Sequence, residues 1–298
     1  RRVVLWPDTF TNYFHPDIAQ AAVEVLENAG FQVRVPEQPV CCGRPLYDFG
    51  MLDRAKSYLQ HVIGTLREEI RGGIPIVVLE PSCASVFRDE MRNLLPQDKD
   101  ARRFSQQVFL LGEFLEKHAP KYSPPPLQPK SKALIHGHCH QKALMGMDPD
   151  VKWLNKLDLD VELIDSGCCG MAGSFGFEKE KYDVSVKCGE HALLGAVRGE
   201  DAATWIVANG FSCQEQISQL TKRHAVHLAQ LMAVALRQKS MPSDSRSKSN
   251  GHSKSYPETS IIEEREQAVW ESMLHAGAGL GAALAVGAGL FWAAKRAA

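Results

Sequence analysis

Short apolar runs alternate with longer stretches of helical periodicity over residues 1–120. Each short run is either a few consecutive apolar residues or an apolar–polar alternation, which is typical of strands. The longer stretches repeat apolar residues three and four positions apart, which predicts amphipathic helices. The expected strands are 3–6, 31–35 and 76–79, and the expected helices are 17–29, 52–70, about 84–95 and about 108–119. This succession predicts a parallel sheet with helices on its faces.

The same succession occurs a second time after residues 121–132, which contain four prolines and predict a linker. The expected strands of this second part are 133–136, 161–164 and 204–207, and its expected helices are 150–157, 178–198 and 224–237. Cysteines follow strands at corresponding places, so that Cys41 corresponds to Cys168, Cys83 to Cys213, and Asp8 to Cys139. We therefore expect an α/β fold of two duplicated units, 1–120 and 133–238, each with a parallel sheet flanked by helices.

The end of the chain has a different composition. Residues 239–260 are rich in Ser, Lys and Pro, which predicts a disordered linker. Residues 261–298 are expected to form a C-terminal helical tail, which ends in nineteen uncharged residues at 276–294 followed by a basic pair. This length fits a membrane span, but thirteen of the nineteen are Gly or Ala, which favours an interfacial or self-packing helix. Membrane contact is expected through this stretch.

Composition narrows the class of protein. The chain has 298 residues, of which 44% are hydrophobic, enough for two cores. Its net charge of −1 gives no reason to expect a nucleic acid partner. Eight cysteines are too few for a disulfide scaffold, and most of them lie in turns or at strand ends, which indicates metal or redox ligation in a cytoplasmic protein. The chain begins at Arg1 within an apolar strand, and we interpret it as a piece of a longer polypeptide.

Four cysteines of the second unit provide the strongest chemical signal. Cys139, the adjacent pair Cys168 and Cys169, and Cys213 each follow an expected strand. The carboxyl ends of parallel strands meet at one edge of a sheet, so we expect these thiols to converge there. Four sulfur ligands suit an iron–sulfur cluster or a tetrahedral zinc ion. The alternative is buried free cysteines, because free thiols often pack as small apolar groups.

The first unit offers a weaker metal site. It contains Cys41, Cys42 and Cys83, and Asp8 stands where the second unit has its first cysteine. Three thiolates and a carboxylate form a candidate metal site, or the remnant of one. Glu80 and His15 are candidate substitute ligands in this unit.

Three histidines alternate around the first cysteine of the second unit. His136, His138 and His140 bracket Cys139, with His138 on the opposite side of the strand end from the other two. A histidine in this place is a candidate metal ligand or proton relay. The alternative is a histidine at a strand end that hydrogen-bonds only to backbone.

Two Cys-Cys-Gly turns, each followed by a helix, a strand and a final cysteine, resemble the cysteine-rich (CCG) domain. Tandem pairs of this domain occur in heterodisulfide reductase, in the glycolate oxidase iron–sulfur subunit and in anaerobic glycerol-3-phosphate dehydrogenase. The stretches 12–16, 41–47 and 80–83 are most similar to the carboxyl-terminal part of fused FAD-linked D-2-hydroxyacid dehydrogenases. The resemblance covers about residues 1–238.

The resemblance implies an iron–sulfur, electron-transfer module of a flavin-linked oxidoreductase. FAD and ferredoxin-like domains or subunits are then expected upstream, so that the substrate site lies outside this sequence. Electrons from a D-2-hydroxyacid of the lactate, glycolate or 2-hydroxyglutarate type would pass through clusters to a quinone or another carrier. We expect a cytoplasmic location, with the cytoplasmic face of the membrane as the alternative.

The sequence departs from the family motif at several ligand positions. The full motif has five cysteines in each unit and ends in Cys-x-x-Cys; Glu80 and Gly210 replace the first cysteine of that pair. The second unit retains four cysteines, enough for a 4Fe-4S cluster or zinc, whereas the first unit needs a non-cysteine ligand for either. The alternative functions are a zinc-bound or metal-free scaffold that docks partner domains, and a thiol–disulfide reductase.

Overall fold

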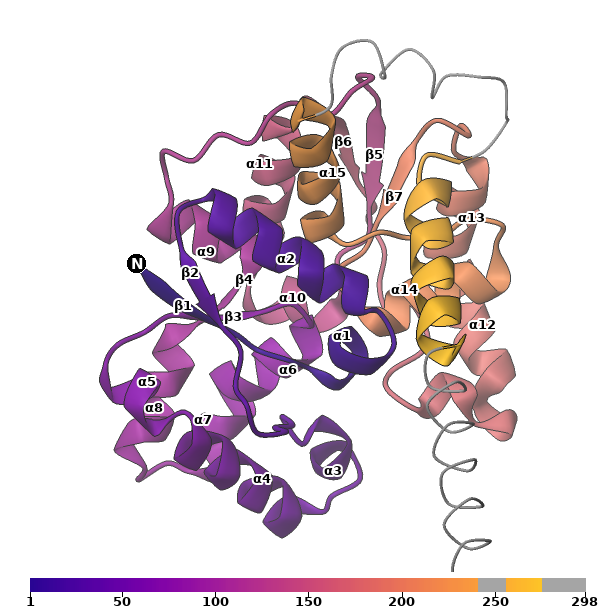
Figure 1. Cartoon of the computed structure of the whole chain (residues 1–298). Helices are drawn as coiled ribbons and strands as arrows, with labels where there is room; N and C mark the ends of the chain where they lie inside the picture. Colours follow the sequence, from indigo (N-terminus) through magenta and orange to yellow (C-terminus); the bar gives the residue numbers. More distant parts are fainter. Residues whose placement is uncertain (241–255, 275–298) are drawn as a thin grey trace, which may run out of the picture. The chain divides into compact units, whose positions relative to one another are not determined.

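A four-stranded sheet forms the centre of the first half of the chain (Figure 1). The computed structural model describes residues 1–240 and 256–274, and the residues up to 258 belong to one compact unit. All strand pairs in this sheet are parallel, and the strand order is β2-β1-β3-β4. The strands are β1 (Arg2–Leu5), β2 (Gln32–Arg34), β3 (Ile76–Val78) and β4 (Val108–Leu110). Strands β3 and β4 are buried throughout, as expected of parallel strands with helices on both faces.

A three-stranded parallel sheet forms the centre of the second half, with the order β6-β5-β7. Its strands are β5 (Lys132–Ile135), β6 (Asp160–Leu163) and β7 (Trp205–Val207). In both halves the first strand lies in the middle, the second on one side and the third on the other. This shared order confirms the predicted α/β fold with two related units. In the second unit the place of β4 is taken by Val226, which forms an isolated parallel bridge with Val207 of β7.

The helices of the first half differ from expectation at several places. They are α1 (Thr9–Tyr13), α2 (Pro16–Asn28), α3 (Arg44–Asp48), α4 (Leu52–Thr65), α5 (Arg67–Arg71), α6 (Pro81–Ser85), the π-helical turn η1 (Val86–Glu90), α7 (Met91–Leu94), α8 (Lys99–Gln107) and α9 (Leu111–His118). Helices α1, α3 and α8 were not expected. The helix expected at 108–119 begins as strand β4, because Val108 to Leu110 pair with β3. The helix expected at 52–70 consists of α4 and α5, which meet at Leu66.

The last helix of the second half packs against the first half. The helices here are α10 (Cys139–Leu144), α11 (Asp148–Lys156), α12 (Tyr182–Glu190), α13 (Leu193–Gly199), α14 (Phe211–Leu220) and α15 (Leu228–Ser240), with the 3-10 turns η2 (Phe175–Phe177) and η3 (Lys179–Lys181). The helix expected at 178–198 is therefore divided into η3, α12 and α13. Helix α15 contacts α2, where Gln230 Nε2 donates to Asp17 Oδ2 at 2.5 Å. The two units are joined through this pair of helices (Figure 1).

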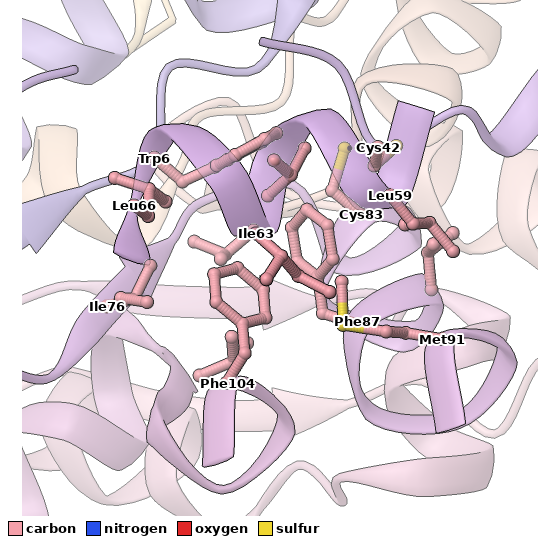
Figure 2. Close-up of a cluster of buried hydrophobic side chains, with 14 of the residues drawn as sticks. Trp6, Cys42, Leu59, Ile63, Leu66, Ile76, Cys83, Phe87, Met91 and Phe104 are labelled. Carbon is pink, nitrogen blue, oxygen red and sulfur yellow. Dashed lines mark hydrogen bonds between the residues drawn. The ribbon is translucent and has the colours of Figure 1, made fainter. Parts of the chain in front are cut away.

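The apolar core of the first unit extends to the cysteines of its candidate site (Figure 2). The rings of Trp6 and Phe87 meet edge to face with their centroids 4.7 Å apart, and Phe104 packs against Phe87 in the same way at 4.9 Å. Cys42 and Cys83 belong to this buried cluster. A substitution at either cysteine therefore changes core packing as well as any metal binding.

A buried ion pair fixes residues 256–258 to the second unit. Nε of Arg223 donates to Oε1 of Glu258 at 2.8 Å, and both side chains are buried. The guanidinium carbon of Arg223 lies 4.3 Å from the centre of the Tyr256 ring. Separating the two side chains would leave an unpaired buried charge, which is energetically costly. The ion pair therefore keeps residues 256–258 against the second unit.

Residues 259–274 form a helix, as expected for the beginning of the C-terminal tail. The predicted membrane-contacting stretch, 276–294, and most of the predicted linker at 239–260 lie outside the described residues. Among the helices in the described part of the chain, none has the length and apolar composition of a membrane span. The domain boundaries at 120, 132 and 238 stay predictions.

A buried carboxyl group in the second unit makes stability depend on pH. Oδ2 of Asp150 accepts hydrogen bonds from Gln141 at 2.5 Å and from Asn209 at 2.8 Å. Burial raises the pKa of Asp150 from 3.8 to about 6. The folded state thus binds this proton more tightly than the unfolded state. The stabilisation that the proton gives is complete below the lower pKa and is lost as the pH rises through the higher one.

We expect Asp150→Asn to gain stability relative to the parent protein as the pH rises from about 4 to about 6, by on the order of 3 kcal/mol. The amide avoids the cost of burying a charge. Urea unfolding of both proteins at several pH values measures the difference. Asp148→Asn, at an exposed position of α11, is the control and should show no such trend. A difference between Asp150→Asn and parent that stays constant with pH would contradict the expectation.

Candidate metal centres

The four cysteines of the second unit come together at the carboxyl ends of its strands. Cys139 begins α10 after β5, and Cys213 lies in the first turn of α14 after β7. Cys168 and Cys169 lie in the turn after β6. Cys169 and Cys213 are buried, whereas Cys139 and Cys168 are partly exposed. The site is therefore closed on one side and reaches solvent on the other.

These thiols form a row in which each contacts the next: Cys139 with Cys168, Cys168 with Cys169, and Cys169 with Cys213. Hydrogen bonds with Cys139 and Cys169 lower the pKa of Cys168, and the hydrogen bond with Cys169 lowers the pKa of Cys213. The hydrogen bond with Cys168 raises the pKa of Cys139 and of Cys169. Thiols this close share their protons, and a metal cation would displace those protons.

A glycine turn positions the adjacent cysteines of the second unit. Gly170 has a φ of +102°, and a Cβ at this position would lie 2.1 Å from the carbonyl oxygen of Ser185. The N–H of Gly170 donates to Sγ of Cys168 at 3.3 Å. Nζ of Lys142 donates to the carbonyl oxygen of Gly167 at 3.1 Å and so supports the other end of the turn. No sequence pattern indicated this role for Lys142.

Three histidines from the end of β5 lie among these thiols. The rings of His138 and His140 stack with centroids 5.3 Å apart, and Nδ1 of His138 accepts the backbone N–H of His140 at 3.2 Å. His136 is buried, with its Nδ1 2.8 Å from Oγ of Ser166. Among the described residues, the group of ligand atoms that all lie within 4.8 Å of one another is His138, Cys139 and His140. This segment therefore adds nitrogen donors to the four sulfurs.

The four thiols are suitable donors for an iron–sulfur cluster or for a tetrahedral zinc ion. Zn–S bonds of about 2.3 Å would place four sulfurs only about 3.8 Å from one another. In the described part of the chain, no three cysteine sulfurs lie within 4.8 Å of one another. Zinc would require the thiols to move toward a common point, and a cluster would hold its cysteines at several iron ions.

The cysteines of the first unit also come together, in a smaller group. Sγ of Cys42 and Sγ of Cys83 lie 3.1 Å apart, and Cys41 contacts Cys42. Gly43 repeats the turn of the second unit, with a φ of +76° and an N–H that donates to Sγ of Cys41 at 3.5 Å. The hydrogen bond with Cys42, together with burial, raises the pKa of Cys41. The duplicated sequence thus produces the same local geometry twice.

Asp8, predicted as a weaker ligand in this unit, caps helix α1. Its Oδ1 accepts the N–H groups of Phe10 at 2.9 Å and Thr11 at 3.0 Å, and its Oδ2 accepts the Thr11 hydroxyl at 2.6 Å. Burial and the nearby Glu80 raise the pKa of Asp8 to about 6. A metal ion at this site would compete with these donors for the carboxylate.

Glu80 and His15 form hydrogen bonds between the two units. Oε1 of Glu80 accepts the N–H of Ser82 at 3.0 Å, and its Oε2 accepts the N–H of Phe211 at 2.8 Å. One carboxylate therefore caps both α6 and α14, the helices that carry the last cysteine of each unit. Nδ1 of His15 lies 3.1 Å from Oε1 of Gln214 on α14. Capping and inter-unit contact are roles that the sequence did not reveal for these residues.

Comparison with known proteins finds a family model and several relatives that resemble this chain. Residues 8–88 match the family model described as the cysteine-rich domain (CCG). A subunit of anaerobic glycerol-3-phosphate dehydrogenase from Escherichia coli is 29% identical over 238 residues, which are 79% of this chain and 59% of that protein. Lactate utilization protein A from Bacillus cytotoxicus is 27% identical over 212 residues, 65% of this chain and 86% of that protein. The chain therefore spans about three fifths of the length of the Escherichia coli relative.

Proposed function

We propose that this chain, which carries the cysteine-rich (CCG) domain that its sequence predicts, is an electron-transfer module of an oxidoreductase and holds an iron–sulfur cluster in its second unit. The observation that carries this proposal is the row of four contacting thiols at the ends of three parallel strands. The names of its relatives, a dehydrogenase subunit and a lactate utilization protein, support a role in redox metabolism.

The residues of the second unit are suited to hold and tune a 4Fe-4S cluster. Cys139, Cys168, Cys169 and Cys213 are the proposed ligands, and the bound cluster would supply one-electron transfer. The buried thiols of Cys169 and Cys213 exclude water on one side, while the partly exposed pair marks the side that a partner can approach. The N–H of Gly170 donates to Sγ of Cys168, and such hydrogen bonds to sulfur adjust the reduction potential.

In the whole protein we infer a flavin-containing partner upstream. FAD and ferredoxin-like domains or subunits would take two electrons from a D-2-hydroxyacid of the lactate, glycolate or 2-hydroxyglutarate type. This module would pass the electrons singly to a quinone or carrier protein. The name of the Bacillus relative supports a hydroxyacid substrate. The free thiols support a cytoplasmic location. The inferred quinone acceptor supports a position at the cytoplasmic face of the membrane. Residues 276–294 would then make the contact with the membrane.

The first unit favours the alternative of a docking scaffold. The oxygens of Asp8 already accept hydrogen bonds within the unit. One oxygen of Glu80 accepts the N–H of Ser82 in the same unit, and the other accepts the N–H of Phe211 in the second unit. Zinc at Cys41, Cys42 and Cys83 would need an oxygen of Asp8 in competition with the α1 cap. We therefore propose that the main role of this unit is structural: it positions the second unit and partner domains.

A redox titration of the anaerobically purified chain tests the proposed function. We expect about four iron and four sulfide ions per chain, and a visible absorbance that bleaches on reduction. The bleaching should be complete after about one electron per chain. A colourless protein with one zinc ion per chain would contradict electron transfer and support the scaffold.

A further inference from the structure

We propose that Lys142 supplies a positive charge that raises the reduction potential of the metal centre in the second unit, and that its side chain holds two of the ligand-bearing segments together. This inference rests on the proposed function, because it concerns the same centre. Lys142 is not one of the proposed ligands. It is a positioning residue, and its ammonium group lies against the turn that carries the adjacent cysteines.

The side chain of Lys142 connects two strand ends of the second unit. Helix α10 begins at Cys139, and Lys142 lies three residues later, about one helical turn along the same face. Its Nζ donates to the carbonyl oxygens of Ser166 and Gly167, the second of these at 3.1 Å. These two residues come directly before Cys168. One side chain therefore joins the helix of the first cysteine to the turn of the next two.

A glycine fixes the path of this side chain. A Cβ at Gly137, just after the end of β5, would lie 2.9 Å from Cγ of Lys142 and 2.7 Å from Sδ of Met147. The glycine thus leaves room for the aliphatic stem of the lysine. A lysine that is held in one place loses rotamer freedom that an exposed lysine keeps. Packing of the stem and two hydrogen bonds from Nζ offset this cost and give the charge a defined position.

The ammonium group of Lys142 forms no ion pair with a carboxylate in the described part of the chain. Both of its acceptors are uncharged carbonyl groups. Lys132, at the start of β5, differs, because its Nζ lies 2.7 Å from Glu162 and 2.8 Å from Glu200. A lysine ammonium is a compact positive charge. The charge of Lys142 is therefore not neutralised by the protein and can interact with an anionic centre.

A positive charge at this place favours the reduced form of the centre. A cluster held by four thiolates is anionic, and reduction adds a further negative charge. The attraction between the cluster and the ammonium group therefore increases on reduction, which raises the reduction potential. Lys142 is partly exposed, so dissolved salt weakens this attraction.

The first unit has a different residue at the corresponding place. Asp8 stands there where the second unit has Cys139, so that Thr11, three residues later, takes the place of the lysine. The hydroxyl of Thr11 donates to Oδ2 of Asp8 at 2.6 Å and so remains within the cap of α1. The unit that has lost its opening cysteine thus also lacks the lysine. This pairing is expected of a residue that serves the metal centre.

Redox titration of the anaerobically purified chain at low ionic strength tests this role. The parent protein is compared with Lys142→Gln, which keeps an N–H donor but loses the charge, and with Lys142→Arg, which keeps both. Lys152→Gln is the matched control, because it removes a positive charge from an exposed position of α11. We expect a more negative midpoint potential in Lys142→Gln, and a potential close to that of the parent in Lys142→Arg and Lys152→Gln.

The iron content separates the two parts of the role. Lys142→Gln should also hold less iron than the parent, because the tie between two ligand-bearing segments is weaker. A purely structural lysine would lower the iron content without changing the potential of the centres that remain. That result would overturn the role of the charge.

The other possible failures are distinguishable as well. A parent protein that holds iron, with a potential that Lys142→Gln leaves unchanged, overturns the inference and leaves the proposed function standing. An equal negative shift in Lys142→Arg or in Lys152→Gln also overturns it. A parent protein without iron overturns both proposals. If Lys142→Gln binds too little iron for a titration, Lys142→Arg decides, since it must retain both the iron and the potential of the parent.

Discussion

Cys168→Ser is expected to abolish the metal centre of the second unit. Cys168 contacts both Cys139 and Cys169 and thus occupies a central place in the row of thiols. A serine hydroxyl stays protonated at neutral pH and is a poor ligand for iron or zinc, so the site loses an essential donor. We expect the iron content per chain to fall at least about tenfold, since metal sites tolerate ligand loss poorly. Iron analysis and visible absorbance measure the change.

Cys188→Ser is the matched control for this experiment. Cys188 is an exposed free cysteine on α12, outside the row of thiols. The same chemical change at this position should leave the iron content and the absorbance unchanged. A Cys168→Ser protein that retains as much iron as Cys188→Ser would show that the thiols of the second unit do not hold the centre.

Gly170→Ala is expected to have the other large effect. The added methyl group would lie 2.1 Å from the carbonyl oxygen of Ser185, and the backbone has a φ of +102°, which disfavours any side chain. Because the obstacle is backbone, the turn that carries the adjacent cysteines must move. We expect a loss of about 3 kcal/mol or more in the free energy of unfolding. Iron should be lost as well, because the turn positions two proposed ligands.

Gly167→Ala provides the comparison on the other side of the same cysteines. A Cβ at Gly167 would meet no atom within 4 Å, and its φ is not in the left-handed region. This variant should unfold at nearly the same urea concentration as the parent and retain its iron. Equal stability of the two alanine variants would contradict the role assigned to the Gly170 turn.

The fold and the convergence of the cysteines followed from local patterns in the sequence. Apolar runs such as 76–79 are short and lie between amphipathic helices, which leaves a parallel sheet as the simplest arrangement. Cys83 and Cys213 each follow such a run, and parallel strands bring their carboxyl ends to one edge. The duplication then predicted a second copy of the same geometry, which the structure shows at Gly43 and Gly170.

Features that depend on distant partners were not predictable from the sequence. Residues 108–110 form a strand because β3 is available beside them, although they precede a helical pattern. Asp8 was interpreted as a ligand from its place in the repeat, but its geometry also matches a helix cap. The environment of His136 depends on Ser166, which lies on a different strand end. Such pairings are set by tertiary packing and leave no periodic signal.

Anomalous diffraction from crystals of the anaerobically purified protein, recorded on both sides of the iron absorption edge, tests the central claim most directly. The claim is that one iron-containing centre lies between the sulfurs of Cys139, Cys168, Cys169 and Cys213. We expect strong anomalous density at that place that disappears below the iron edge. Two results would contradict it. One is density that is equally strong on both sides of the iron edge and increases only above the zinc edge; the other is no anomalous density between these sulfurs.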